Sequence, residues 1–253
     1  MQQPQLYFVF YFIFIIKIVI MKKYVLAALA VITILAGYSQ SEDNSRETRK
    51  VTGFQGVRVS GGIDLYISSG AESVSVSAAN SNIRNHMVTE VINGILSIHL
   101  EKNWSPDEGS PKMKAYVSIT TLKYLEASGG GDIYIQQEIT AGDLNVRLSG
   151  GGNLKGKLRA DHLDIKQSGG SNVDLTGNVK NLAVEASGGG NLKGYDLVTD
   201  FASILASGGS DTEITVNKEL RVVTSGGSGV RYKGSASVVS VSSSGGGSLS
   251  HKD

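Results

Sequence analysis

The sequence contains no cysteine among its 253 residues. It therefore forms no disulfide and has neither a cysteine-based zinc site nor a thiol nucleophile. A bacterial lipoprotein needs a cysteine at its cleavage site, whereas Leu35-Ala36-Gly37 is followed here by Tyr38. We therefore expect an exported chain that is not a Cys-anchored lipoprotein.

The chain also has no large excess of positive or of negative side chains. The whole chain carries 24 Lys and Arg against 23 Asp and Glu. Three of the lysines (Lys17, Lys22 and Lys23) precede residue 40, which leaves 21 positive and 23 negative side chains, a net charge of −2, in the remainder. Because there is no basic patch interleaved with aromatic residues, we expect no nucleic-acid partner.

Catalytic motifs are missing as well. The four histidines (His86, His99, His162 and His251) have no common spacing, and no His-x-x-x-His, Gly-x-Ser-x-Gly or phosphate-loop motif occurs. Outward carboxylates on neighbouring strands approach one another in any stacked fold, so such pairs are weak evidence for glycoside cleavage. We therefore expect no catalytic residue, metal or cofactor.

Glycine, in contrast, is abundant, with 32 residues, and much of it lies in a Ser-Gly-Gly repeat. The copies begin at Ser128, Ser149, Ser168, Ser187, Ser207, Ser225 and Ser244, at spacings of 21, 19, 19, 20, 18 and 19 residues. An eighth copy begins at Ser60, 68 residues upstream of Ser128. A period near 19 indicates that one short unit is copied and stacked.

Each unit has the pattern of two strands. The fifth and third residues before the serine are apolar, as in Leu144 and Val146 or Leu182 and Val184, and polar residues separate them. This alternation is typical of a strand with one buried face. A second short strand follows the glycines. Since 19 residues cannot hold two strands and a crossover helix, the pattern predicts an all-β solenoid of about seven rungs.

Two rows of residues recur at fixed places in the unit. The first glycine of each copy is predicted to form a structural corner, since glycine reaches positive φ without steric cost; these are Gly129, Gly150, Gly169, Gly188, Gly208, Gly226 and Gly245. The fourth residue after the serine is predicted to form a turn ladder of Asp132, Asn153, Asn172, Asn191 and Asp211. Calcium binding is a less favoured alternative, because calcium-binding β-rolls repeat every nine residues.

The residues just described resemble the family called putative auto-transporter adhesin, head GIN domain, which occurs in secreted proteins of Bacteroidetes-type bacteria. The resemblance rests on the repeats, on the opening segment FQGVRVSGGIDLYI (54–67) and on the ending around RYKG (231–234) and SSGGGS (243–248). It covers residues 51 to 250. It implies a right-handed parallel β-helix-like fold and supplies no catalytic residues.

The segment before residue 51 is predicted to lie outside this fold. Residues 21–39 have the form of a secretory signal peptide, with cleavage after Ser39. Residues 1–20 are a second apolar stretch, explained either by a start codon placed too early or by a membrane anchor. Residues 40–50 read as a disordered lead-in. Export to the periplasm, cell surface or medium is expected, with membrane contact only through an uncleaved signal.

The single predicted domain, 51–250, has two parts. Residues 128–250 are the regular repeats, and residues 51–127 are predicted to be wider, irregular coils that cap one end. Aromatic residues gather in the second part, and we expect Trp104, Tyr66 and Tyr116 to contact a ligand, because aromatic faces stack on sugars. Trp104 is the strongest candidate, since it lies in a polar loop next to Pro106.

The favoured function from the sequence is an adhesin-like, non-catalytic envelope module that recognises a glycan or another cell-surface component. A glycan-active enzyme and a structural spacer without a ligand are the alternatives. The sequence does not define an oligomeric state.

Overall fold

The computed structural model describes residues 46–106 and 112–253, all within one compact unit, Ser45–Asp253. The predicted upstream segment 1–20 and signal peptide 21–39 lie outside the described residues. The described residues are 69% strand and 2% helix, which confirms the all-β prediction.

The strands fall into two groups, which we call the stack and the cap. The stack consists of β2 (Gly56–Ser60), β3 (Ile63–Ser69), β8 (Tyr124–Gly129), β9 (Ile133–Ile135), β10 (Ile139–Gly150), β11 (Asn153–Gly169), β12 (Asn172–Gly188), β13 (Asn191–Ala206), β14 (Asp211–Thr224), β15 (Gly229–Lys233), β16 (Ser237–Ser243) and β17 (Ser248–His251). The cap consists of β1 (Glu47–Arg49), β4 (Ser73–Ser77), α2 (Ser81–Asn85), β5 (Met87–Ile92), β6 (Ile95–Leu100) and β7 (Met113–Ile119).

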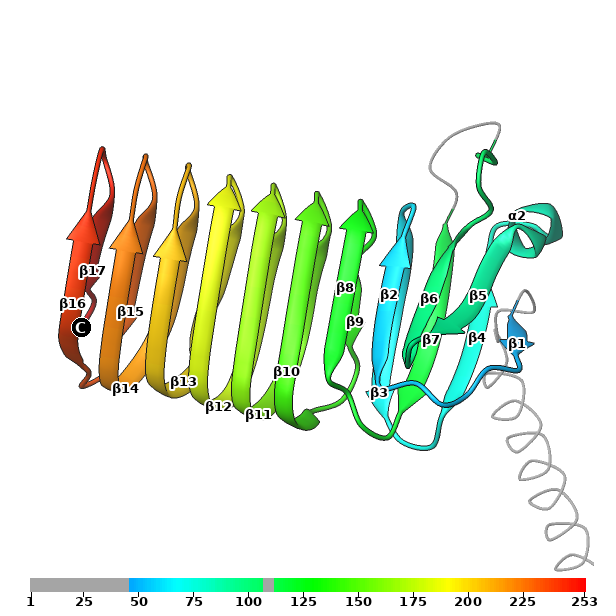
Figure 1. Ribbon diagram of the computed structural model, residues 1–253, viewed down its shortest axis with the longest axis horizontal. Helices are drawn as coiled ribbons and strands as arrows, with labels where there is room; N and C mark the ends of the chain where they lie inside the picture. The colour runs from blue at the N-terminus through cyan, green and yellow to red at the C-terminus, as the bar shows by residue number, and fades with distance from the viewer. Residues whose placement is uncertain (1–45, 107–111) are drawn as a thin grey trace, which may run out of the picture. The chain divides into compact units, whose positions relative to one another are not determined.

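Strands of the stack are parallel and pair with an offset of one repeat. Ser149 of β10 lies beside Ser128 of β8 and beside Ser168 of β11. Each repeat is therefore one turn of a parallel β-solenoid of about seven turns, as predicted. Figure 1 shows the turns side by side, with every corner at the upper edge of the view.

The eighth Ser-Gly-Gly copy joins the same stack, although it lies 68 residues upstream. β2 pairs in parallel with β8, and Ser60 lies beside Ser128. β3 pairs in the same way with β9, where Leu65 lies beside Ile133. The segment 70–123 therefore leaves the stack after β3 and returns to it at β8.

This excursion builds the cap on the other edges of β2 and β3. β6 and β7 add parallel strands there. β4 and β5 then pair antiparallel with β7 and β6, and β1 pairs antiparallel with β4. Figure 1 shows this group at the right-hand end.

Two predictions for this region need correction. Residues 51–127 are not simply wider coils, because period-2 alternation does not distinguish parallel from antiparallel strands. The missed signal was Asn93-Gly94 between β5 and β6, with φ of 51° and 75°, since this dipeptide favours a tight hairpin. Residues 47–49, placed in the disordered lead-in, form β1 instead.

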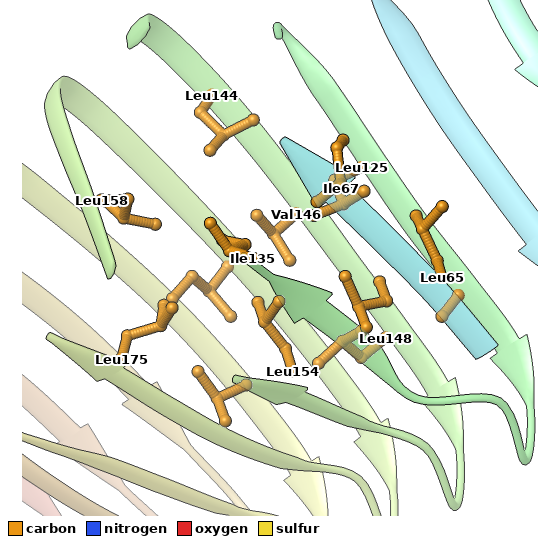
Figure 2. Close-up of a cluster of buried hydrophobic side chains, with 14 of the residues drawn as sticks. Leu65, Ile67, Leu125, Ile135, Leu144, Val146, Leu148, Leu154, Leu158 and Leu175 are labelled. Atoms are coloured by element: carbon orange, nitrogen blue, oxygen red, sulfur yellow. The ribbon is translucent and has the colours of Figure 1, made fainter. Parts of the chain in front are cut away.

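The core runs along the inside of the stack. The predicted inward positions are buried: Leu144 and Val146 are 1% and 0% exposed, and Leu182 and Val184 are both 3% exposed. Figure 2 shows side chains from both sides of the solenoid, among them Leu125 and Leu154, meeting inside it. The strand phase predicted from the alternation is therefore confirmed.

Steric contact between neighbouring turns explains why glycine occupies the corners. Gly150 has φ +97°, and a Cβ atom on it would lie 2.3 Å from the backbone oxygen of Gly129 in the neighbouring turn. The corresponding atom on Gly188 would lie 2.6 Å from Gly169 O. A Cβ atom would lie within 3.0 Å of the neighbouring backbone at the five corner positions from Gly150 to Gly226, whereas at Gly129 the nearest atom is 3.5 Å away.

At the end of the turn opposite the Ser-Gly-Gly corner, the chain bends in β11 and β12 without leaving the strand. β11 and β12 each continue as paired strand for 17 residues, through the bend and up to the next corner. Gly177 sits in this bend with φ +118°. Backbone pairing thus continues around most of each turn, and the corner is the main interruption.

Candidate binding surfaces

The stack has two outer faces. We call the face formed by the strand segments that end at a corner the pre-corner face, and the face formed by the segments that follow a corner the post-corner face. Residues at the same distance from the serine form a row along each face, since the turns pair in register.

The predicted turn ladder runs along the post-corner face as a chain of side-chain hydrogen bonds. Asn153 Nδ2 donates to Asp132 Oδ1 at 2.7 Å, and Asn172 Nδ2 donates to Asn153 Oδ1 at 2.9 Å. Asn191 Nδ2 then donates to Asn172 Oδ1 at 3.1 Å. An amide can donate to one neighbour and accept from the other, which suits asparagine to the middle of such a row.

The acidic residues are also engaged. Asp64, which the sequence reasoning missed, begins the ladder and accepts the backbone N–H of Asp132 at 3.0 Å. Asp132 uses its second carboxylate oxygen to accept the Tyr134 hydroxyl at 3.0 Å. At the other end, Asp211 lies 3.5 Å from Arg231. Among residues 46–106 and 112–253, no three His, Asp or Glu side chains gather as a metal site. Independence from calcium stays a prediction.

Two of the predicted contact residues meet in a stack of tyrosine rings. Tyr66 lies between Tyr116 and Tyr134, with ring centroids 5.1 and 5.0 Å apart and planes tilted by 20° and 19°. The outer face of Tyr116 is covered by the Arg46 guanidinium, 3.4 Å from the ring centroid. The ring faces are thus occupied within the protein, so the expectation that Tyr66 and Tyr116 stack on a sugar does not fit this geometry.

Tyr134 ends this stack and has a perturbed acidity. Burial raises the pKa of its phenol to about 12, and the hydrogen bond to the Asp132 carboxylate acts in the same direction. Both causes favour the neutral phenol, because ionisation would place a negative charge beside a carboxylate. Tyr134 is therefore uncharged well above neutral pH.

Trp104 lies away from the tyrosines, in the loop between β6 and β7. It is half-buried and packs against the core, and its indole lies on the His86 ring with centroids 4.3 Å apart and planes 6° apart. His86 is held from its other side, with Nδ1 2.8 Å from the backbone oxygen of Asn82. Trp104 is thus partly covered by His86 and the core, and its role as a ligand contact stays a prediction.

A groove that the sequence reasoning missed crosses the pre-corner face over β10 to β14. Its volume is about 430 Å³. Residues from five successive turns line it: Asp143, Leu144, Asn145, His162, Leu163, Asp164, Asn181, Leu182, Ala183, Phe201, Ala202, Ser203 and Arg221. The leucines form the floor, since they belong to the buried row.

The groove exists because one outward-facing row has smaller side chains in its middle than at its ends. The fourth residue before each serine is Asn145, Asp164, Ala183, Ser203 and Arg221 in successive turns. The small side chains of Ala183 and Ser203 leave space in the middle of this row. The larger side chains of Phe201 and His162 belong to the neighbouring row, formed by the sixth residue before each serine. Towards the cap the row of Ala183 and Ser203 holds Tyr124, which lies outside the lining of the groove.

Tyr124 is fixed in place by its own cluster. Its hydroxyl donates to Glu126, and Arg58 Nε donates to the same carboxylate oxygen at 2.8 Å. Burial, followed by the hydrogen bond to Glu126, raises the pKa of Tyr124. Tyr124 is therefore part of a hydrogen-bonded cluster.

The chemistry of the groove is that of a hydrogen-bonding surface open to water. His162 Nδ1 lies 2.9 Å from Asp143 Oδ1, but the two side chains are 63% and 78% exposed. Lys218 lies 5.5 Å from the centroid of the Phe201 ring and 2.8 Å from Asp200. The groove thus offers amides, carboxylates, an imidazole, a guanidinium and one aromatic ring along a single line.

The family assignment follows from the repeated turns and the corner motif. The model described as "Putative auto-transporter adhesin, head GIN domain" matches residues 53–236. The chain belongs to this family. The match covers β2 to β15, hence both the cap and most of the stack, and it makes the protein adhesin-like. A search of curated proteins found no match.

Solved structures share the fold. A putative adhesin from Bacteroides fragilis is 22% identical, with a TM-score of 0.73, 82% of this chain covered and 95% of that one. A putative lipid binding protein from Parabacteroides distasonis is 20% identical, with a TM-score of 0.65 and coverage of 83% and 98%. A putative adhesin from Parabacteroides merdae is 18% identical, with a TM-score of 0.63 and coverage of 83% and 96%. At these identities the likeness concerns the fold alone.

The described part of the chain, 46–106 and 112–253, contains no helix with the length and hydropathy needed to cross a bilayer.

Proposed function

We propose that the protein is an exported, non-catalytic adhesin-like module that binds a glycan chain along the groove of the pre-corner face. The observation that carries the proposal is the groove itself, which crosses five turns and is lined by polar side chains beside Phe201. Export is supported by the predicted signal peptide at residues 21–39 and by the adhesin family.

The lining suits a hydroxyl-rich ligand. Sugar hydroxyls donate and accept hydrogen bonds, and Asn145, Asn181 and Asp164 offer both kinds of partner. Phe201 adds an apolar ring for the C–H face of a sugar. Because the turns repeat at about 4.8 Å, these groups recur along a line, which suits a linear polymer.

A lipid ligand fits the groove less well. One structural neighbour is named a putative lipid binding protein. An acyl chain requires an enclosed apolar cavity, whereas this groove is open and its walls carry Asp143, His162 and Arg221. We therefore favour the glycan.

A hydrolase is also less favoured. The only His–Asp pair of the groove, His162 with Asp143, is well exposed. Catalytic sites exclude water and hold their acid and base in a shaped, partly buried pocket. A polar surface in water supports binding rather than bond cleavage.

The test is a glycan array probed with the wild-type protein and with Ala183→Trp. Ala183 is exposed at the centre of the groove, so tryptophan there fills the groove without entering the core. We expect binding to weaken roughly tenfold or more. Lys193→Trp, on the exposed post-corner face, is the matched control and should bind as the wild type does.

Three outcomes would contradict the proposal. Equal binding by Ala183→Trp would exclude the groove. Absence of any glycan ligand would favour a spacer. Turnover of a bound polysaccharide that Asp143→Asn abolishes would favour the enzyme.

A further inference from the structure

The two ends of the solenoid differ in how their backbone edges are protected. At the cap, the outermost strand on one side is β1, only three residues long, and charged side chains surround it: Glu47 lies 3.1 Å from both Arg49 and Arg84. Short edge strands and charges are devices by which proteins prevent edge-to-edge pairing.

The other end, formed by β16 and β17, is open within the described residues. β16 pairs only with β14, and β17 pairs only with β15, so each strand leaves one edge of N–H and C=O groups without a strand partner. Figure 1 shows both strands as the last turn at the left-hand end.

The end of the core is exposed at the same place. Val238 and Val241 pair with the buried Leu220 and Val222, so they belong to the inward row. No further turn among residues 46–106 and 112–253 covers them, and they are 37% and 50% exposed. Val239, at the register shift of β16, is 47% exposed.

Most of the last turn also lacks charge, and its exceptions follow residue 250: His251 at the end of β17, then Lys252 and Asp253. Residues 234–250 contain no Asp, Glu, Lys, Arg or His and consist of serine, glycine, valine, alanine and leucine. Earlier turns differ: the turn around Ser187 carries Lys180, Glu185 and Lys193. Like charges would face each other if an end met its own copy, so a neutral end is the one that can pair with itself.

We propose that the C-terminal turn, β16 and β17, is a self-association surface whose partner is the same turn of a second copy. A two-fold axis brings the two last turns edge to edge, extends both sheets and covers Val238 and Val241. Such a contact is isologous and closed. Head-to-tail growth is disfavoured on the β1 side of the cap, where the edge is short and charged. The inference does not depend on the glycan groove.

The expected complex is weak. One turn offers a small end face, which falls in the range of transient interfaces rather than permanent dimers. We therefore expect a monomer at low concentration and a dimer at chain concentrations on the order of 100 µM. In the dimer the two caps lie at opposite ends.

The experiment is sedimentation velocity of the full exported chain over a concentration series. Ser242 is exposed on the outer row of β16, so Ser242→Lys and Ser242→Glu change the edge without entering the core. Each variant alone should dimerise roughly tenfold more weakly or worse, because like charges meet. An equimolar mixture of the two should dimerise again.

Ile92→Lys is the matched control, since Ile92 is 52% exposed on the cap, and it should leave dimerisation unchanged. Circular dichroism establishes that every variant is folded. A wild-type chain that stays monomeric over the whole concentration series would overturn the proposal. A dimer insensitive to both Ser242 variants, or open-ended oligomers, would overturn it as well.

Discussion

The stack and the cap are built from similar strands but are held together in different ways. In the stack, each residue lies beside its equivalent in the next turn, so one position repeats its contacts along a row: Asn153, Asn172 and Asn191 make the same hydrogen bond in turn. In the cap, contacts are individual, as in the Trp104–His86 pair.

This difference decides where a binding surface can form. A row of equivalent positions becomes a groove when its side chains shrink, as at Ala183 and Ser203. The aromatic residues of the cap and its neighbouring turns are instead used for packing, as in the tyrosine stack. Repetition supplies the continuous surface, and the cap supplies a closed end.

The largest expected effect breaks the buried row of the stack. Val184→Asp places an unpaired charge at a position that is 3% exposed, and we expect it to destabilise the protein by several kcal/mol. Denaturant unfolding measures this. The neighbouring exposed Glu185, paired with Lys166, is the control, and Glu185→Gln should cost less than about 1 kcal/mol. Equal costs would mean that the strand phase is wrong.

The next effect concerns the corner. Gly188→Val needs a strained φ of +94° and places Cβ 2.6 Å from a backbone oxygen, so we expect a loss of about 1–3 kcal/mol or more. Gly189 is the matched control, because a Cβ atom on it would meet no heavy atom within 4 Å. Gly189→Ala should change the unfolding free energy by less than about 1 kcal/mol. A harmless Gly188→Val would show that neighbouring corners are further apart than described.

A smaller effect tests the amide ladder. Asn172→Ala removes one donor and one acceptor from the row and should cost about 1–3 kcal/mol of unfolding free energy. Asn178→Ala, at an exposed position of the same strand, should be close to neutral. Similar values for both variants would mean that the ladder adds no stability.

The smallest effect is a shift in acidity. Tyr134 should ionise near pH 12, which ultraviolet titration of wild type against Tyr134→Phe can measure. A pKa raised on folding stabilises the native state below the unfolded value of about 10, and this contribution is lost as pH rises through 12. Asp132→Asn should move the pKa of Tyr134 back towards 10, and an unchanged value would exclude the carboxylate as a cause.

Much of the stack could be predicted from the sequence, because its period and alternation determine both the register and the buried row. Leu144, Val146 and Val184 were assigned correctly on that basis. Asp64 was missed because its turn lies 68 residues upstream of the next one. The antiparallel cap was missed because alternation carries no strand direction, although Asn93-Gly94 marked one hairpin.

The groove was missed for another reason. It depends on which outward residues lie side by side, and therefore on reading rows across turns rather than along the chain. Ala183 and Phe201 are unremarkable in their own segments, and only the register brings them together. Trp104 is less exposed than its polar loop suggested, because His86 and the core pack against it in the fold.

The most direct test of the account compares one residue of each region in the same binding assay. The variants Phe201→Ala in the stack and Trp104→Ala in the cap are titrated with the best glycan from the array. We predict that Phe201→Ala weakens binding about 10- to 100-fold, while Trp104→Ala lowers the melting temperature but keeps the affinity of the folded protein. The reverse result, with affinity lost through Trp104 and kept without Phe201, would contradict the account.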